Sequence, residues 1–190
     1  LCGLFFLMLF PVKNRVLGKV LFSGIILLSF SLPFILQPVR NQIPDDFLLQ
    51  GIAKQASTIQ RFEVWDFTIT QIKQSPIYGH GIEAQRFLKS DTWMEHQRAD
   101  SILHAHNIIL QIWLEFGVIG ILFGTAFLIY CYKMIYNQED LQTRRLYLTI
   151  FTACFCCAMT GYGVWQSWQV GTFFFFTAVA VAIRRPFLKG

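Results

Sequence analysis

The sequence is short of charged residues. Only 14% of the 190 residues are Asp, Glu, Lys or Arg, whereas 54% are hydrophobic and 20 are Phe. Soluble domains are usually about 25% charged and 45–50% apolar. The apolar residues are also clustered, and several windows approach the ~20 residues that an α-helix needs to cross a membrane. The sequence therefore excludes an ordinary soluble domain and predicts an all-α, multi-pass membrane protein.

The hydrophilic part of the chain, from about residue 40 to residue 107, has no cysteine, which excludes a disulfide framework there. All the cysteines lie in apolar stretches, where we interpret them as small fillers of helices: Cys2, Cys131, Cys154, Cys156 and Cys157. No basic face with interleaved aromatic residues occurs either, although the net charge is +5. The sequence therefore predicts no nucleic-acid partner.

Leu1 lies within an apolar run, without a charged region before it or a small-residue cleavage site after it. This pattern is unlike a secretory signal peptide. We expect the chain to be the C-terminal part of a longer protein.

Hydrophobic stretches predict three parts. Residues 1–37 hold two spans, the first truncated; residues 38–107 form a large loop; residues 108–190 hold three spans and a cytoplasmic tail. The individual spans are predicted at 1–11, 16–37, 108–136, 146–161 and 169–183.

The orientation follows from the short connections between spans. If the spans alternate, their basic residues share one side, which the positive-inside rule makes cytoplasmic: Lys13, Arg15, Lys19, Lys133, Arg144, Arg145, Arg184, Arg185 and Lys189. The 38–107 loop then faces outward.

One helix is predicted within this loop. Ser57 and Gln60 fit a capping box, and Ser75-Pro76 ends the helix, because a residue before proline disfavours helical angles. An apolar stripe at helical spacing lies between them: Ile59, Phe62, Trp65, Ile69 and Ile72. We expect the stripe to pack on the membrane or on the ends of the spans, with Arg61 on another side.

A glycine-rich turn follows at Gly79-His80-Gly81. Glycines allow backbone angles closed to other residues and allow a ligand to approach the main chain. An ordinary loop turn and a binding turn fit this pattern about equally well.

All four histidines lie in the outward loop: His80, His96, His104 and His106. A zinc site is disfavoured, since no H-x-x-x-H pair places two of them on one helix face. A single histidine acting as a general base is more economical, because its ordinary pKa lies near 6.5. Solvated loop histidines remain the alternative.

A polar stripe enters the following hydrophobic helix. Asn107, Gln111 and Glu115 recur every four residues among Ile, Leu, Trp and Phe. Polar groups at membrane depth usually face a bundle interior or a wet cavity, so a site-lining role is favoured over a hydrated helix end. Beyond them, Gly117, Gly120 and Gly124 are small residues near four-residue spacing, which predicts close helix packing.

Together these residues resemble the O-antigen ligase and polymerase superfamily. The ordered pattern is R…P-x-x-G-x-G…H-N-x-x-L-Q-x-x-x-E-x-G-x-x-G. It runs from Arg61 through Pro76, Gly79 and Gly81 to His106-Asn107 and Gly120, within residues 58–124. The set is much more specific than any of its parts.

The resemblance implies a GT-C-like polytopic bundle of transmembrane helices with a large periplasmic loop that contains short helices. It also implies a metal-independent glycosyltransferase of the bacterial inner membrane that needs no cofactor. The donor would be a glycan on undecaprenyl diphosphate, and the acceptor a sugar hydroxyl of the lipid A–core.

The resemblance further assigns roles by position. His106 would be the general base and Arg61 would stabilise the diphosphate. Asn107, Gly79, Gly81 and His104 would contact substrate, while Gln111 and Glu115 would support the site. The alternatives are an O-antigen polymerase, a non-catalytic carrier of lipid-linked sugars, a purely structural subunit, and an inactive truncated product.

Overall fold

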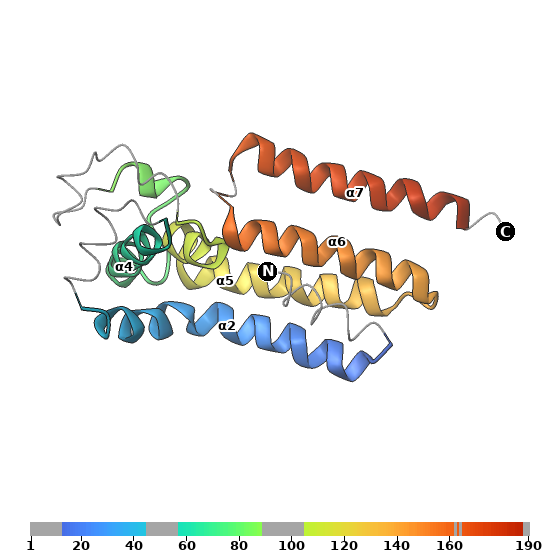
Figure 1. The fold of residues 1–190 in the computed structure, drawn as a ribbon, viewed down its shortest axis with the longest axis horizontal. Helices are drawn as coiled ribbons and strands as arrows, with labels where there is room; N and C mark the ends of the chain where they lie inside the picture. Colours follow the sequence, from blue (N-terminus) through green and yellow to red (C-terminus); the bar gives the residue numbers. More distant parts are fainter. Residues whose placement is uncertain (1–12, 45–56, 89–104, 162, 164, 188–190) are drawn as a thin grey trace. The chain divides into compact units, whose positions relative to one another are not determined.

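The computed structural model describes residues 13–44, 57–88, 105–161, 163 and 165–187. Figure 1 shows the order of the elements, which are α2 (Arg15–Asn41), α4 (Ser57–Gln74), the 3-10 helix η2 (Ala84–Arg86), α5 (Ile108–Tyr136), α6 (Leu141–Thr160) and α7 (Ser167–Phe187). No strand occurs in these described ranges, so the all-α prediction is confirmed for them.

Two of the helices are long and apolar enough to cross a membrane. α2 has 27 residues and α5 has 29, and an 18-residue stretch of each has a mean hydropathy of 2.1. At 1.5 Å per residue both exceed the ~30 Å of a hydrocarbon core. They coincide with the spans predicted at 16–37 and 108–136. α6 and α7 coincide with the last two predicted spans, whose passage through a membrane stays a prediction.

The helix of the first described span extends beyond residue 37, where the span was predicted to end. α2 continues through Pro33 and Pro38 to Asn41. Each proline removes one backbone donor, and helices in apolar surroundings tolerate this loss where neighbouring groups compensate. The extension places Arg40 in the last helical turn rather than in the loop.

The polar connection predicted at 137–145 is also shorter than expected. The Asp140 carboxylate accepts hydrogen bonds from the backbone N–H groups of Gln142 (3.2 Å) and Thr143 (2.7 Å), so α6 begins at Leu141. Arg144 and Arg145 therefore belong to the helix. In the same way α7 runs on through residues 184–186, where the last span was predicted to stop.

The chain divides into two compact units. Unit 1 consists of residues 1–27 and 123–190, and unit 2 of residues 28–122. α2 and α5 each contribute to both.

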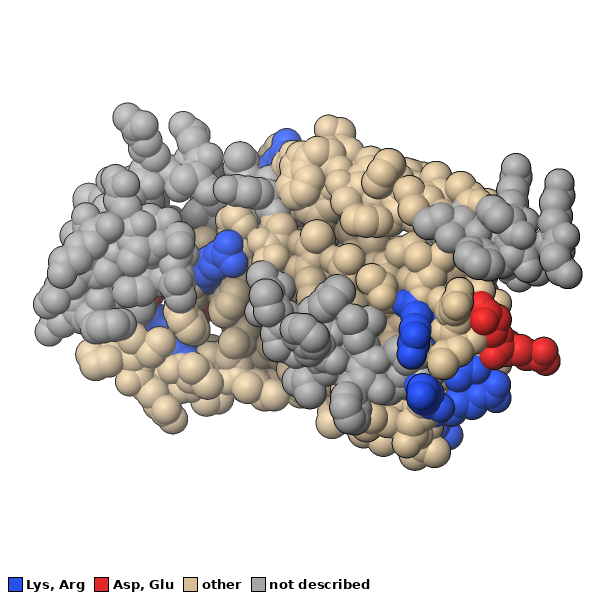
Figure 2. All heavy atoms as spheres, turned by 45° about the vertical axis from the view of Figure 1, so that its right-hand side comes forward, with Lys and Arg blue, Asp and Glu red and all other residues tan. Residues whose placement is uncertain are grey.

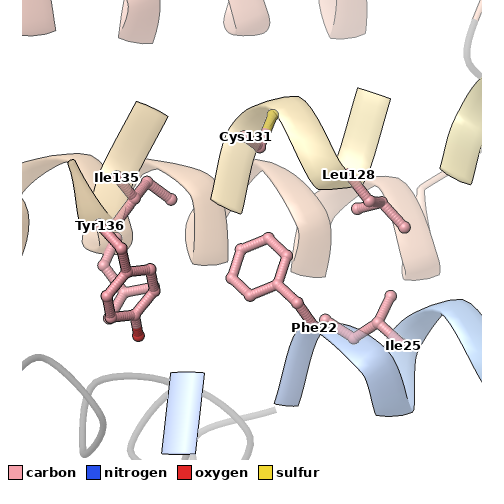
Figure 3. Close-up of a cluster of buried hydrophobic side chains, with 7 residues drawn as sticks. Phe22, Ile25, Leu128, Cys131, Ile135 and Tyr136 are labelled. Carbon is pink, nitrogen blue, oxygen red and sulfur yellow. The ribbon is translucent and has the colours of Figure 1, made fainter. Parts of the chain in front are cut away.

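Unit 1 is built around a cluster of buried apolar side chains. Figure 3 shows Phe22 and Ile25 of α2 facing side chains of α5. The members are Phe22, Ile25, Leu128, Cys131, Ile135, Tyr136 and Leu148. The Phe22 ring also stacks on Phe151 of α6, with centroids 4.9 Å apart. These contacts unite α2, α5 and α6 within unit 1.

Basic residues mark one end of unit 1. The Tyr132 hydroxyl donates to the carbonyl oxygen of Arg15 (3.2 Å), which brings the start of α2 to the end of α5. Figure 2 shows basic side chains gathered beside acidic ones at one end of the molecule. Lys19 and Lys133 are exposed, whereas Arg144 is buried and lies over the Tyr136 ring. That all the basic residues of the short connections share one side, and that this side is cytoplasmic, stays a prediction.

In unit 2, α4 packs on the described ends of the predicted spans. Arg40 of α2 forms an ion pair with the buried Glu63 of α4, with Nε and Oε1 3.3 Å apart. Ile69 and Ile72 of α4 are buried, as the apolar stripe predicted. The helix ends at Gln74, just before Ser75-Pro76. The side chains of the predicted capping box lie outside the described part of the chain.

Candidate functional site

Helix α5 is interrupted in its middle. Gly117 has φ 60° and ψ −152°, a conformation outside the helical region. This region is essentially restricted to glycine. The prediction that Gly117 belongs to a helix-packing motif is therefore wrong. A Cβ on Gly120 would meet Phe116 and Ile112 of its own helix, and a Cβ on Gly124 would meet nothing within 4 Å.

The loop at residues 76–81 supplies hydrogen-bond partners for the backbone groups of α5 on both sides of this interruption. The N–H groups of His80 and Gly81 donate to the carbonyls of Leu114 (2.8 Å) and Glu115 (2.9 Å). On the other side of the break, Val118 and Ile119 donate to the carbonyls of Pro76 (2.8 Å) and Ile77 (3.4 Å). Backbone groups freed at an apolar depth must find partners inside the protein. We call residues 76–81 and 114–119 the interlock.

Two glycines make the interlock possible. A Cβ on Gly79 would lie 2.4 Å from the carbonyl carbon of Glu115, and a Cβ on Gly117 would lie 2.4 Å from the carbonyl oxygen of Ile77. Gly79 and Gly81 have φ values of 69° and 95°, so the predicted freedom of this turn is confirmed. Their N–H groups donate within the protein, so a substrate role would rest on the missing side chains rather than on the backbone donors.

The polar stripe of α5 is buried. Asn107 and Gln111 are each 7% exposed and Glu115 is 3% exposed, so the hydrated helix end is excluded. The Oε1 atom of Glu115 accepts from the Gln111 side-chain amide (2.9 Å) and from the backbone N–H of Glu83 (3.1 Å). Glu115 thus fixes the chain beyond Gly81 to α5, which agrees with a supporting role.

Replacing Glu115 by alanine should lower the thermal stability of the protein. The buried amide of Gln111 and the part-buried N–H of Glu83 would lose their acceptor. A buried donor left without a partner costs about 1–3 kcal/mol. Glu139, an exposed residue after α5, is the matched control, and its replacement by alanine should change little. The midpoint of thermal unfolding of the purified variants measures the difference. Equal midpoints for the two variants would contradict the role given to Glu115.

Asn107 caps α5. Its side-chain oxygen accepts from the backbone N–H groups of Ile109 (2.9 Å) and Leu110 (3.2 Å). This is the usual work of an asparagine that precedes a helix. The cap fixes where α5 starts, and a contact of Asn107 with substrate stays a prediction.

His106, the residue before the cap, has an unusual backbone. Its φ is 50°, in the left-handed region, at a cost of about 1–2 kcal/mol for a residue with a side chain. Such conformations persist only where the surroundings impose them, and they concentrate at functional sites. The neighbours on both sides, Ala105 and Asn107, are buried, while His106 itself is half-buried.

Helix α4 contacts this turn directly. The indole N–H of Trp65 donates to the carbonyl oxygen of Ala105 at 2.8 Å. Arg61 lies one helical turn before Trp65, and side chains four residues apart on a helix are neighbours, about 5–6 Å apart at Cβ. The structure therefore brings the helix that carries Arg61 against the turn that carries His106.

The other histidines divide into two groups. His80 is held to α4, because its Nε2 lies 2.8 Å from the carbonyl oxygen of Gln71 and must donate to it. His96 and His104 lie outside the described residues, so the predicted contact of His104 with substrate is untested. Among the residues that are described, no group of three or more His, Cys, Asp or Glu could hold a metal ion.

Comparison with known proteins decides the family. The model of the O-antigen ligase family matches residues 1–125, which is more than half of the chain. The chain belongs to the O-antigen ligase family. Two long apolar helices agree with the membrane location of such a protein.

Candidate polysaccharide ligases of three Rickettsia species are similar to this family member. The protein of Rickettsia conorii is 32% identical over 81% of the chain and 39% of its own length. The proteins of Rickettsia felis (31% identical; 81% and 40% covered) and Rickettsia prowazekii (29%; 80% and 39%) give similar values. The chain thus spans about two fifths of the length of the relatives that it matches. No solved structure matches it significantly.

Two contacts of this ligase-family chain had no clear signal in the sequence. In the sequence, Trp65 is a member of the apolar stripe. Its indole nitrogen can donate a hydrogen bond, but nothing in the sequence indicates that the acceptor is Ala105. Glu63 is a charged residue on a buried face of α4, and that inconsistency is the one sign of its pairing with Arg40.

Proposed function

We propose that the protein is a ligase-type glycosyltransferase. It transfers a glycan from undecaprenyl diphosphate to a sugar hydroxyl of the lipid A–core. Membership of the O-antigen ligase family supports this reaction class. The observation that carries the site assignment is the contact of Trp65 with Ala105, which places the Arg61 helix beside His106.

In the proposed reaction His106 is the general base. Its imidazole takes the proton of the acceptor hydroxyl while that oxygen attacks the anomeric carbon of the donor glycan. The new glycosidic bond forms as the bond from the anomeric carbon to the diphosphate oxygen breaks. The proton rests on His106 and the electron pair leaves with undecaprenyl diphosphate, so the step balances. General bases of this kind contribute about 10²- to 10⁴-fold in rate.

Arg61 stabilises the leaving group. Charge develops on the diphosphate as the bond breaks, and a guanidinium can donate two parallel hydrogen bonds to phosphate oxygens. Arg61 is half-buried on α4, one turn from Trp65. Arg61 therefore belongs to the stretch of α4 that contacts the His106 turn.

The proposed protein lies in the bacterial inner membrane as a polytopic bundle, with the site in the 38–107 loop facing the periplasm. Both substrates reach it from the outer leaflet, since each glycan is carried on a lipid. Gln111 and Glu115 support the site by fixing the loop to α5.

A deletion strain of the native bacterium separates this reaction from polymerisation. Deletion of the gene should leave the lipid A–core without any attached O-antigen, because a ligase adds the whole glycan at once. Lipopolysaccharide separated on a gel measures the result, with the intact gene supplied on a plasmid as the control. Core that carries a single repeat would indicate a polymerase, and unchanged lipopolysaccharide would contradict both reactions.

A further inference from the structure

We propose that Trp65 is a positioning residue that sets the direction of the His106 imidazole through the backbone of Ala105. This inference rests on the function proposed above, because it concerns the same base. It adds a second residue of α4 to the site, one that need not touch substrate.

The geometry of the turn carries the inference. His106 adopts a left-handed backbone conformation at the start of α5, and a side chain follows the angles of its own backbone. The residue before it presents its carbonyl to the indole nitrogen of Trp65 at 2.8 Å, and Ala105 is fully buried. The residue after it caps α5 with its side chain. His106 is thus held from both sides, by Trp65 before it and by the Asn107 cap after it.

Helix α4 gives this contact a further consequence. The Trp65 ring packs edge-on against Phe62, with centroids 5.4 Å apart. This contact on the same helix helps to orient the indole. Arg61 belongs to the same stretch of α4. One turn of α4 therefore carries both Arg61 and the indole N–H that binds the carbonyl of Ala105, the residue before His106.

The matched test compares two tryptophans. Trp65→Phe keeps an aromatic ring beside Phe62 but removes the indole N–H together with part of the ring. Trp113→Phe makes the same change in α5, where the indole nitrogen donates to the carbonyl oxygen of Ser29, also at 2.8 Å. Both variants lose one long-range hydrogen bond to a backbone carbonyl, so their midpoints of thermal unfolding should fall similarly.

Only Trp65→Phe should change catalysis. Its turnover in the full-length protein should fall about 10- to 100-fold, as expected for a misplaced catalytic group. The KM for the lipid-linked donor should stay within about twofold, because ground-state binding is retained. In a His106→Ala background, Trp65→Phe should cause no further loss, since residues that act through one another are not additive.

A second readout keeps the test independent of turnover. The rate at which diethyl pyrocarbonate modifies His106, measured by mass spectrometry of the peptide, should change in Trp65→Phe and stay the same in Trp113→Phe. Equal turnover and equal His106 reactivity in the two variants would overturn the positioning role. An active His106→Ala variant would instead overturn the proposed function, and the reactivity comparison would still decide whether Trp65 positions the ring.

Discussion

Replacing His106 or Arg61 by alanine in the full-length protein should nearly abolish glycan transfer. Loss of a general base costs about 10²- to 10⁴-fold in rate, and loss of one charge-stabilising donor costs about 10²- to 10³-fold. Both variants should still insert into the membrane, because neither side chain belongs to an apolar face that spans it. Capped lipopolysaccharide in a deletion strain that expresses each variant, with membrane fractions blotted for the protein, measures both effects.

Two residues of the same loop serve as matched controls. His80→Ala removes a histidine whose ring is already engaged with the carbonyl of Gln71, so it should lower stability but leave turnover near normal. Arg86→Ala removes an arginine that pairs at 3.3 Å with Glu83, where both side chains are about one third exposed. Exposed pairs contribute little. Full activity of His106→Ala or Arg61→Ala would defeat the site assignment.

Replacing Gly117 by alanine should destabilise the protein by about 3 kcal/mol or more. The backbone conformation of Gly117 alone costs about 1–3 kcal/mol for any other residue. The new Cβ would also lie 2.4 Å from the carbonyl oxygen of Ile77, so the interlock would have to separate. Separation removes hydrogen bonds from backbone groups on both sides of the break. The midpoint of thermal unfolding and the yield of folded protein in detergent measure the change.

Gly124→Ala is the control for this prediction. Gly124 belongs to the same helix, and a Cβ there would meet nothing within 4 Å. Alanine has a higher helix propensity than glycine by about 1 kcal/mol. Gly124→Ala should therefore leave stability unchanged or raise it. A Gly117→Ala variant as stable as Gly124→Ala would mean that the interruption of α5 is not required for the fold.

The parts of the fold that sequence reasoning could predict are those with a periodic or chemical signature. The start of α5 follows Asn107, the end of α4 precedes Pro76, and the apolar stripe of α4 is buried at Ile69 and Ile72. The ordered motif identified the family, which the family model confirms. Each of these depends on which residue type stands at which spacing.

The interlock could not be predicted in that way. Residues 108–136 are mostly hydrophobic apart from the polar stripe, and Gly117 is one of three glycines in them, so their composition does not mark a break at Gly117. The bonds that compensate for the break join backbone atoms, and backbone atoms are the same in every residue type. The bond from Trp65 to Ala105 escapes prediction for the same reason, since its acceptor is a main-chain carbonyl. Gly79 and Gly117 are the only features of the sequence that indicate the close approach of the two segments. Glycine also occurs at many positions for other reasons, so these two residues alone do not predict the interlock.

The interlock also limits which segments of the chain can move. Residues 76–81 cannot swing away as a lid, because opening would strand four main-chain groups of α5 next to apolar surroundings. Each stranded group costs several kcal/mol in a membrane interior. Residues 76–81 therefore stay bound to α5, and under the proposed function the lipid-borne glycan would enter past other segments.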